Sequence, residues 1–302
     1  MQRHQSLVVP ETARGASVAM GNFDGLHLGH QSVIDLARKP DLPLGVVTFE
    51  PHPRQVFAPD APPFRLMNAT ARASRLEKLG VDHLYEIPFD MDLASLTPQR
   101  FINEVLVEGL GIAHLVVGAD FRFGKGRAGT TETLADAPFE LTVAPLLEGA
   151  EGPVSSTAIR EALSEGRPQD AAAMLGHLHR IEGVVEHGFK RGREMGFPTA
   201  NISMAGLHLP AFGIYACRVD VRDGPHRGTY DAVASLGSRP TFGDHPPNLE
   251  VMLLDFDGDL YGAELSVALL HYQRPELKFD GMEPLIAQMH ADVTETRRLL
   301  AQ

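Results

Sequence analysis

The sequence predicts an α/β domain with a parallel sheet, followed by a small antiparallel β-barrel and a C-terminal helix. Three observations support this fold class. Up to about residue 178, short apolar segments alternate with helical patterns. From residue 179, strand-like segments follow one another with only turn signals between them, and the C-terminal residues place apolar side chains at helical spacing. We therefore expect two domains, 1–178 and 179–302.

The first domain is expected to have six strands, at 6–9, 17–21, 44–49, 83–87, 114–118 and 141–144. Helical periodicity is found between or after them, at 29–38, 70–80, 98–110, 156–164 and 168–178. Strands that alternate with helices form a parallel sheet covered on both faces, and ligands bind beyond the carboxyl ends of its strands. The turns that follow these strands are therefore the candidates for a site.

The second domain is expected to be a small antiparallel barrel or sandwich, with strands at 181–187, 213–221, 230–236, 249–256 and 265–271. Turn signals separate these segments, among them Asp223-Gly224 and Asp257-Gly258. A final helix at 282–300 carries apolar residues at helical spacing. We expect this helix to plug the barrel or to pack on it.

Composition limits the possible functions. The 302 residues are 43% hydrophobic and 22% charged, as in soluble globular proteins, and a formal net charge of −12 argues against a nucleic acid partner. Cys217 stands alone, which permits no intramolecular disulfide and favours a reducing compartment. Neither a signal-type N-terminus nor a membrane-spanning apolar run is found. We expect a cytoplasmic protein that binds small molecules; the sequence leaves its oligomeric state open.

The most informative stretch is 18–31, where an apolar strand leads through a glycine-containing turn into a helical pattern. The turn brings His27 and His30 to the start of the helix, three residues apart and on one face. Gly29 between them allows a ligand to approach the backbone closely. Because a helix start attracts phosphate and two imidazoles can stabilise developing negative charge, the stretch predicts nucleotide chemistry.

A zinc site is the main alternative for this pair, since His-x-x-His can supply two of four ligands. The chain has one cysteine and no second His or Cys pair at ligand spacing nearby. The position of the pair between strand and helix also favours the phosphate interpretation over a structural one.

The stretch from Gly21 to His30, Gly-Asn-Phe-Asp-Gly-Leu-His-Leu-Gly-His, resembles the His-x-Gly-His signature of nucleotidyltransferases. In this extended form it resembles bacterial bifunctional riboflavin kinase/FMN adenylyltransferases, also called FAD synthetases. The resemblance implies a Rossmann-like nucleotidyltransferase domain that converts FMN and ATP to FAD, and a riboflavin kinase barrel that makes FMN with ATP and Mg²⁺. It also implies that His27 and His30 are catalytic and that the nucleotide is bound by Gly21, Asn22, Phe23, Asp24 and Gly29.

Three further first-domain segments match this family. Thr48-Phe-Glu-Pro-His-Pro53 would by its prolines alone be a stiff surface loop, and the resemblance places His52 at the flavin and nucleotide pocket. Val117-Gly-Ala-Asp-Phe-Arg-Phe-Gly124 implies ligand binding by Asp120, Phe121 and Phe123. Ser155-Ser-Thr-Ala-Ile-Arg160 would alone be explained by helix capping. The resemblance implies a catalytic Arg160 and triphosphate binding by Ser155, Ser156 and Thr157.

Two other nucleotide motifs are excluded. The segment from Gly118 to Lys125 approaches a phosphate-binding P-loop, but five residues separate its glycines instead of four. Gly126 also stands where that motif requires Ser or Thr. The chain contains no Gly-x-Gly-x-x-Gly fingerprint, so a dinucleotide-dependent dehydrogenase has no support.

The second domain contains a basic, glycine-rich segment from Gly188 to Asn201. On composition it is a cationic hairpin loop, although the Thr199 hydroxyl and the Asn201 carboxamide are reasonable magnesium and phosphate ligands. Its end, Gly-Phe-Pro-Thr-Ala-Asn, resembles bacterial riboflavin kinases, which implies Thr199 and Asn201 at the metal. Segments 238–243 and 273–279 also match, and ligand binding is implied for Gly183, Lys190, Gly192, Gly196, Pro198 and Arg274.

Glu250 lies in an otherwise apolar strand, where a buried carboxylate without a partner is costly. It is therefore on a wet face or functional, and the resemblance implies that it accepts the proton of the riboflavin hydroxyl. The family often has His where Met252 stands, and strand alternation places Met252 on the same face as Glu250.

Two other functions are compatible with parts of the sequence. One is a nucleotidyltransferase for another phosphorylated acceptor with a flavin-binding accessory barrel, for which the phosphopantetheine class is the nearest analogue. The long C-terminal matches argue against it. The other is a flavin-binding or storage module without activity, which would not need His27, His30, Arg160 and Glu250 together.

Overall fold

The computed structural model describes residues 1–145, 148–149, 152–186, 196–237 and 247–301. Internal contacts divide the chain into two compact units. The first consists of Met1–Pro62 and Arg72–Ser155, and the second of Pro63–Ala71 and Ser156–Gln302. Contacts thus group residues 156–178 with the C-terminal part, while the division of activities at residue 178 stays a prediction.

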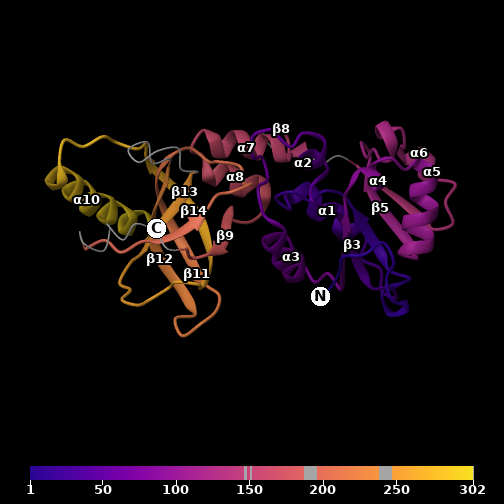
Figure 1. Cartoon of the computed structure of the whole chain (residues 1–302), viewed down its shortest axis with the longest axis horizontal. Coiled ribbons are helices and arrows are strands. Elements are labelled where there is room, and N and C mark those ends of the chain that lie inside the picture. Colours follow the sequence, from indigo (N-terminus) through magenta and orange to yellow (C-terminus); the bar gives the residue numbers. More distant parts are fainter. Residues whose placement is uncertain (146–147, 150–151, 187–195, 238–246, 302) are drawn as a thin grey trace. The chain divides into compact units, whose positions relative to one another are not determined.

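The first unit is built on a six-stranded parallel sheet, as predicted, in the order β1-β4-β3-β2-β5-β6 (Figure 1). The central strands are buried on both faces, which explains their continuous apolar runs. The strands are β1 Gln2–His4, β2 Ser17–Met20, β3 Leu44–Glu50, β4 His83–Pro88, β5 His114–Gly118 and β6 Glu140–Ala144.

Short helical elements connect these strands: η1 Glu11–Ala13, α1 Leu28–Leu36, α2 Pro53–Phe57, α3 Ala69–Lys78, α4 Met91–Ala94, α5 Pro98–Arg100, the π-helical η2 Phe101–Gly109, η3 Lys125–Arg127 and α6 Thr131–Leu134. A two-stranded ribbon of β7 Glu148–Gly149 and β8 Gly152–Pro153 follows β6.

The predicted strand at 6–9 is wrong. The first strand is instead Gln2–His4, which lies at the edge of the sheet and pairs with β4. Its side chains are polar, and Arg3 donates to the carboxylate of Glu86 at 2.7 Å. In the apolar run that suggested the strand, Val8 is 70% exposed and only Val9 is buried. Edge strands can be held by backbone pairing and polar contacts, so hydrophobicity alone does not find them.

The second unit contains an antiparallel barrel of six strands in the order β10-β13-β12-β11-β14-β9. A bridge between Glu186 and Asn201 brings its two end strands together, so the barrel is nearly closed. β10 was not predicted, because its first two residues belong to the segment interpreted as a ligand loop. The strands are β9 Arg180–Val184, β10 Ala200–Ser203, β11 Gly213–Val221, β12 Gly228–Gly237, β13 Asn248–Leu253 and β14 Glu264–Arg274.

Among the described residues of this unit, three helices lie outside the barrel: α7 Ser156–Ser164, α8 Pro168–Leu175 and α10 Met282–Leu300. The last packs against β11, β12 and β14 (Figure 1). Gln273 donates to the Thr296 hydroxyl at 2.6 Å, and Arg274 pairs with Asp292. No side chain of α10 belongs to the described core of the barrel, so the helix packs on the barrel rather than plugging it.

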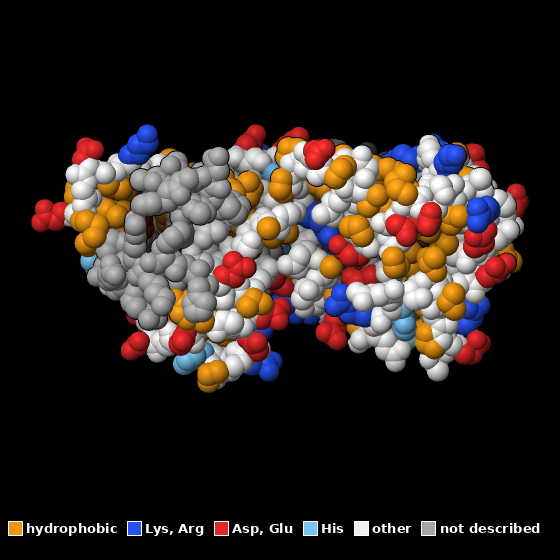
Figure 2. Space-filling view, viewed as in Figure 1, with side chains coloured by type: hydrophobic (Ala, Val, Ile, Leu, Met, Phe, Trp, Pro, Cys, Tyr) orange, Lys and Arg blue, Asp and Glu red, His pale blue; other side chains and the backbone are white. Residues whose placement is uncertain are grey.

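The surface is of mixed charge. Figure 2 shows acidic and basic side chains interspersed over the visible face of the described residues. None of the helices in the described part of the chain is long and apolar enough to cross a membrane.

Candidate active sites

The carboxyl ends of β2, β3 and β5 lie at one edge of the parallel sheet. The chain continues from β2 to β3 on one side, while β5 pairs with β2 on the other. Such a reversal of strand order opens a crevice in which α/β proteins bind ligands. The turns after these strands carry predicted site residues: Gly21–Asp24, His27, His52 and Asp120.

The two predicted catalytic histidines are in contact. His27 is the N-cap of α1, and its Nδ1 accepts a hydrogen bond from the backbone N–H of His30 at 3.3 Å. The imidazole rings are stacked, with centroids 3.6 Å apart. Since Nδ1 of His27 accepts, the neutral ring carries its proton on Nε2. The structure therefore confirms the expected juxtaposition at a helix start.

His30 is held as a neutral ring. Burial, with a smaller effect from the nearby His27, lowers the pKa of His30 well below 6.5. Its Nδ1 is buried and has no hydrogen-bond partner among the described residues. A buried N–H without a partner is costlier than a bare lone pair, which favours the tautomer with the proton on Nε2. His30 can then donate one hydrogen bond to a phosphate.

The turn before α1 is fixed by its backbone. Phe23, Gly25 and Leu26 all have positive φ, which brings the chain sharply from β2 into the helix. The buried Thr48 hydroxyl of β3 donates to the Asn22 carbonyl at 3.2 Å. A Cβ at Gly29 would lie 3.2 Å from the His27 ring, so glycine leaves room for the stacked imidazoles. Phe23 and Asp24 are buried, whereas Asn22 is exposed and Gly21 is half-buried.

His52 has a structural role, while its place at the flavin and nucleotide pocket stays a prediction. Its Nδ1 accepts from the Arg54 N–H at 3.1 Å, and the Gln55 side chain accepts from the His52 N–H. These contacts form a capping box at the start of α2, after the cis Glu50–Pro51 bond. The loop is thus rigid, and His52 stays half-buried at the edge of the sheet.

The three residues predicted after β5 have different environments. Asp120 is exposed, whereas Phe123 is buried and belongs to the hydrophobic core. Phe121 is half-buried and stacks on Phe123 with centroids 5.8 Å apart. Phe123 therefore anchors the turn, and Asp120 and Phe121 are the residues of this group that a ligand can reach.

One exposed aromatic was missed by sequence reasoning. Phe57 ends α2 and is 61% exposed, although it makes an edge-to-face contact with Phe89 at 5.7 Å. Phe89 itself directly follows β4, and Phe57 follows the capped His52 loop. In the sequence, Phe57 could have been noticed as an aromatic residue that follows the predicted His52 loop. Single exposed apolar side chains are common on protein surfaces, so it is the position of Phe57 after the predicted His52 loop that makes its ring a candidate contact for a flavin.

Arg160 lies in α7 and therefore in the second unit. Its Nε donates to the Phe64 carbonyl at 2.6 Å, and its guanidinium lies 5.6 Å from the Phe64 ring centroid. The residues before it in the motif are half-buried or exposed: Ser155, Ser156 and Thr157. The pairing of Arg160 with the two histidines stays a prediction.

The predicted kinase residues meet on three adjacent strands. Asn201 of β10 pairs directly with Glu250 of β13, and Glu250 pairs with Ser235 of β12. Directly paired residues have side chains on one face of the sheet. Along β13 the core side chains are Leu249, Val251 and Leu253, which leaves Glu250 half-buried on the opposite face. Of the two alternatives for Glu250, a wet face or a functional role, the structure shows the non-core face, and the role as a base stays a prediction.

The side chain of Asn201 is oriented by a neighbour. Its Oδ1 accepts from Asn248 Nδ2 at 2.9 Å, and its own Nδ2 donates to the Thr199 carbonyl at 3.4 Å. Asn201 is only 9% exposed, whereas Thr199 is half-buried. Phe197, just before the predicted Pro198, contacts His290 of α10 edge to face at 5.0 Å.

Other predicted kinase residues have structural contacts. Gly183 of β9 lies so close to β10 that a Cβ would come within 2.7 Å of Ile202. Gly196 has φ +82°, which favours glycine. Arg274, predicted at the flavin, donates Nε to Asp292 at 2.8 Å and thereby fastens α10 to β14. Lys190, Gly192 and the match at 238–243 lie outside the described residues.

Comparisons with known proteins match both halves of the chain. The family model described as FAD synthetase matches residues 9–158, and the one described as riboflavin kinase matches residues 175–300. A Listeria monocytogenes relative named bifunctional riboflavin kinase/FMN adenylyltransferase is 39% identical over 94% of this chain and 92% of its own length. The chain belongs to the bifunctional riboflavin kinase/FMN adenylyltransferase family.

Another relative and a solved structure are similar to this chain over nearly its whole length. A riboflavin kinase/FMN adenylyltransferase from Pseudomonas fluorescens is 40% identical over 95% of this chain and 94% of its own. A crystal structure described as a macrolide-efflux protein from Streptococcus pneumoniae is 33% identical, covers 98% of both chains and has a TM-score of 0.83. The chain thus has both domains of a riboflavin kinase/FMN adenylyltransferase, a bifunctional transferase of FAD biosynthesis.

The riboflavin kinase domain of this family member has donors that fit magnesium. Thr199 and Asn201 offer neutral oxygens, the hard donors that Mg²⁺ takes together with substrate phosphates. The described residues contain no group of three or more His, Cys, Asp or Glu side chains suited to a metal.

Proposed function

We propose that this chain makes FAD from riboflavin in two ATP-dependent steps and that each step uses its own residues. The observation that carries the proposal is the presence of two separate constellations. Asn201 pairs with Glu250 on the barrel, and His27 stacks on His30 at the switch point of the parallel sheet. The chain's relatives have names that combine a kinase and an adenylyltransferase.

In the kinase step, Glu250 accepts the proton of the terminal ribityl hydroxyl of riboflavin. The hydroxyl oxygen forms a bond to the γ-phosphorus of ATP as the bond to the β,γ-bridging oxygen breaks, which yields FMN and ADP. Thr199 and Asn201 would hold Mg²⁺, which neutralises phosphate charge when bound. Asn248 keeps the Asn201 oxygen in place through its 2.9 Å hydrogen bond.

In the adenylyl transfer step, a phosphate oxygen of FMN attacks the α-phosphorus of ATP and pyrophosphate leaves. The phosphate is already anionic at neutral pH, so this step needs alignment and charge stabilisation rather than a strong base. His27 and His30 donate to the phosphates at the start of α1, and Arg160 holds the triphosphate. The other predicted residues of the turns after β2, β3 and β5 line the flavin and nucleotide pocket.

We place the enzyme in the cytoplasm, in keeping with a lone, buried Cys217 and small-molecule substrates. The absence of a nucleic acid partner stays a prediction from the net charge.

The function is tested by mixing the purified chain with riboflavin, ATP and Mg²⁺ and separating the products by chromatography. FAD with transient FMN is expected. FMN as the end product would contradict the adenylyl transfer assignment and point to another acceptor for the first domain. FAD formed only from added FMN would contradict the kinase assignment.

We further propose that the flavin ring stacks on Phe57. Phe57→Ala is expected to raise KM for FMN by about tenfold, because one aromatic stacking contact contributes about 0.5–1.5 kcal/mol beyond buried area. Steady-state adenylyl transfer with varied FMN measures this effect. Leu36→Ala, which truncates another exposed apolar side chain on the same unit, is the matched control. An unchanged KM for FMN in Phe57→Ala would contradict the stacking role.

A further inference from the structure

Arg160 is oriented by a residue from a remote part of the chain. Its Nε donates to the Phe64 carbonyl at 2.6 Å, and its guanidinium lies near the Phe64 ring. Phe64 is buried and belongs to the segment Pro63–Ala71, which groups with the second unit. One edge of the guanidinium is thus fixed, while Arg160 itself stays half-buried.

A second contact holds the backbone of Arg160. Nε2 of His208 lies 3.0 Å from the Arg160 carbonyl and 3.1 Å from the Ser164 hydroxyl. Because a carbonyl oxygen can only accept, Nε2 carries the proton. That N–H exists in both the neutral and the protonated imidazole, so this hydrogen bond does not depend on the charge of His208. The hydrogen bond from His208 therefore fixes the turn of α7 that carries Arg160.

The two residues that contact Arg160, Phe64 and His208, lie on segments that are themselves hydrogen-bonded to each other. His208 donates its backbone N–H to the Arg65 carbonyl at 2.8 Å, and Arg65 forms a bridge with Leu207. The segment that carries Phe64 therefore pairs with the residues around His208. These residues follow β10 after a short turn in which the Leu207 N–H donates to the Met204 carbonyl at 3.1 Å.

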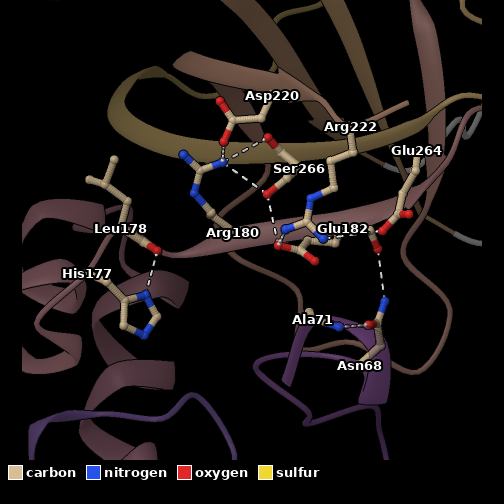
Figure 3. A network of polar contacts seen from close by, with 10 residues as sticks. All are labelled: Asn68, Ala71, His177, Leu178, Arg180, Glu182, Asp220, Arg222, Glu264 and Ser266. Atoms are coloured by element: carbon tan, nitrogen blue, oxygen red, sulfur yellow. Dashed lines mark hydrogen bonds and ion pairs between the residues drawn. The ribbon is translucent and has the colours of Figure 1, made fainter. Parts of the chain in front are cut away.

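The same segment is fastened to the barrel at its other end. Asn68 Nδ2 donates to the Glu182 carbonyl of β9 at 2.9 Å, and Asn68 Oδ1 accepts from the Ala71 N–H (Figure 3). The buried Glu182 carboxylate is in turn held by the Ser266 hydroxyl at 2.9 Å and by Arg222. Figure 3 shows this network continuing to Arg180 and Asp220. Both supports of Arg160 are thus anchored on barrel strands.

We propose that His208, a residue of the riboflavin kinase half, is a positioning residue for adenylyl transfer. This inference rests on the proposed function, in which Arg160 holds the ATP triphosphate. A guanidinium stabilises developing phosphate charge effectively only if it is oriented before the reaction. His208 provides that orientation by clamping α7 and by pairing with the segment that presents Phe64.

The test compares two variants of the full chain, His208→Leu and His208→Gln. Leucine removes the donor at similar volume, whereas the glutamine amide keeps an N–H near the position of Nε2. His208→Leu is expected to lower kcat for adenylyl transfer about tenfold, the effect of about one hydrogen bond, and to leave riboflavin kinase turnover unchanged. His208→Gln is expected to stay within about twofold of the parent chain in both reactions.

His271→Leu is the matched control. His271 Nδ1 lies 2.7 Å from Gln169 Nε2, so this histidine contacts α8 just as His208 contacts α7. Both activities are expected to be retained in this variant. Equal loss of adenylyl transfer in His208→Leu and His208→Gln, or no loss in His208→Leu, would overturn the positioning role. A parallel loss of kinase activity in His208→Leu would also overturn it, since that would indicate general damage to the second unit.

FAD formation by the parent chain shows whether a negative result refutes this inference alone or the proposed function as well. FAD formation by the parent chain, together with full adenylyl transfer in His208→Leu, refutes the inference alone. If the parent chain makes no FAD from FMN and ATP, both the function and the inference fail.

Discussion

Replacing Glu250 with glutamine is expected to lower riboflavin kinase turnover by a factor of about 10³ while adenylyl transfer from supplied FMN continues at the rate of the parent chain. Glutamine keeps the shape of the side chain and its contacts on the open face of β13, but it cannot accept the hydroxyl proton. The loss should therefore appear in kcat, with little change in KM for riboflavin. Parallel assays of ADP release and of FAD formation measure both activities in one preparation.

Glu264→Gln is the control for this prediction. Glu264 is also a strand carboxylate of the barrel, but it pairs with Arg222 at 3.3 Å and has no place in the proposed chemistry. Both activities should be retained in that variant. If Glu250→Gln reduces the two activities equally, the sites are not separate; if kinase turnover survives, Glu250 is not the base.

Much of the fold was predictable because burial leaves a pattern in the sequence. The parallel strands near 44–49 and 114–118 are buried on both faces and therefore appear as unbroken apolar runs. The barrel strand at 213–221 and the final helix at 282–300 match the expected ranges. Two of the strands that were missed, β1 and β10, are short. Their pairing partners, β4 and β13, lie far away in sequence, so no local signal marks them.

From local residue patterns, the site was predictable only where its members are close in sequence, whereas the grouping of Asn201 with Glu250 was expected only from the family resemblance. His27 and His30 are three residues apart on a helix start, and their contact follows from helix geometry. The hydrogen bond from Arg160 to Phe64 and the ion pair of Arg274 with Asp292 join residues that are not neighbours in sequence. Such tertiary partners have no periodicity that one sequence could reveal.

Replacing His30 with alanine is expected to lower kcat for adenylyl transfer by a factor of about 10²–10³, with KM for FMN within about threefold of the parent chain. The Nε2–H of His30 stabilises charge that develops on the departing pyrophosphate. Its loss therefore raises the activation barrier of adenylyl transfer more than it weakens the binding of FMN. Riboflavin kinase turnover should be unaffected. Steady-state kinetics with FMN and ATP provide both constants.

His4→Ala is the matched control, because His4 also contacts a second histidine. Its Nε2, on the edge strand β1, lies 3.1 Å from Nδ1 of His83 on the neighbouring strand β4. This variant should retain adenylyl transfer. A large rise in KM for FMN in His30→Ala at unchanged kcat would show that His30 binds flavin instead of stabilising the transition state.

The lowered pKa of His30 determines how this effect depends on pH. A base whose pKa lies well below 6.5 is already neutral at about pH 6.5 and stays neutral up to about pH 8. The neutral ring keeps its donor N–H over this range, so the ratio of kcat/KM between the parent chain and His30→Ala should stay constant. If protonated His30 were the active form, that ratio would fall about tenfold for each pH unit, because the imidazolium fraction falls by that factor. The pH profile therefore decides whether His30 acts as a neutral hydrogen-bond donor or as a cation.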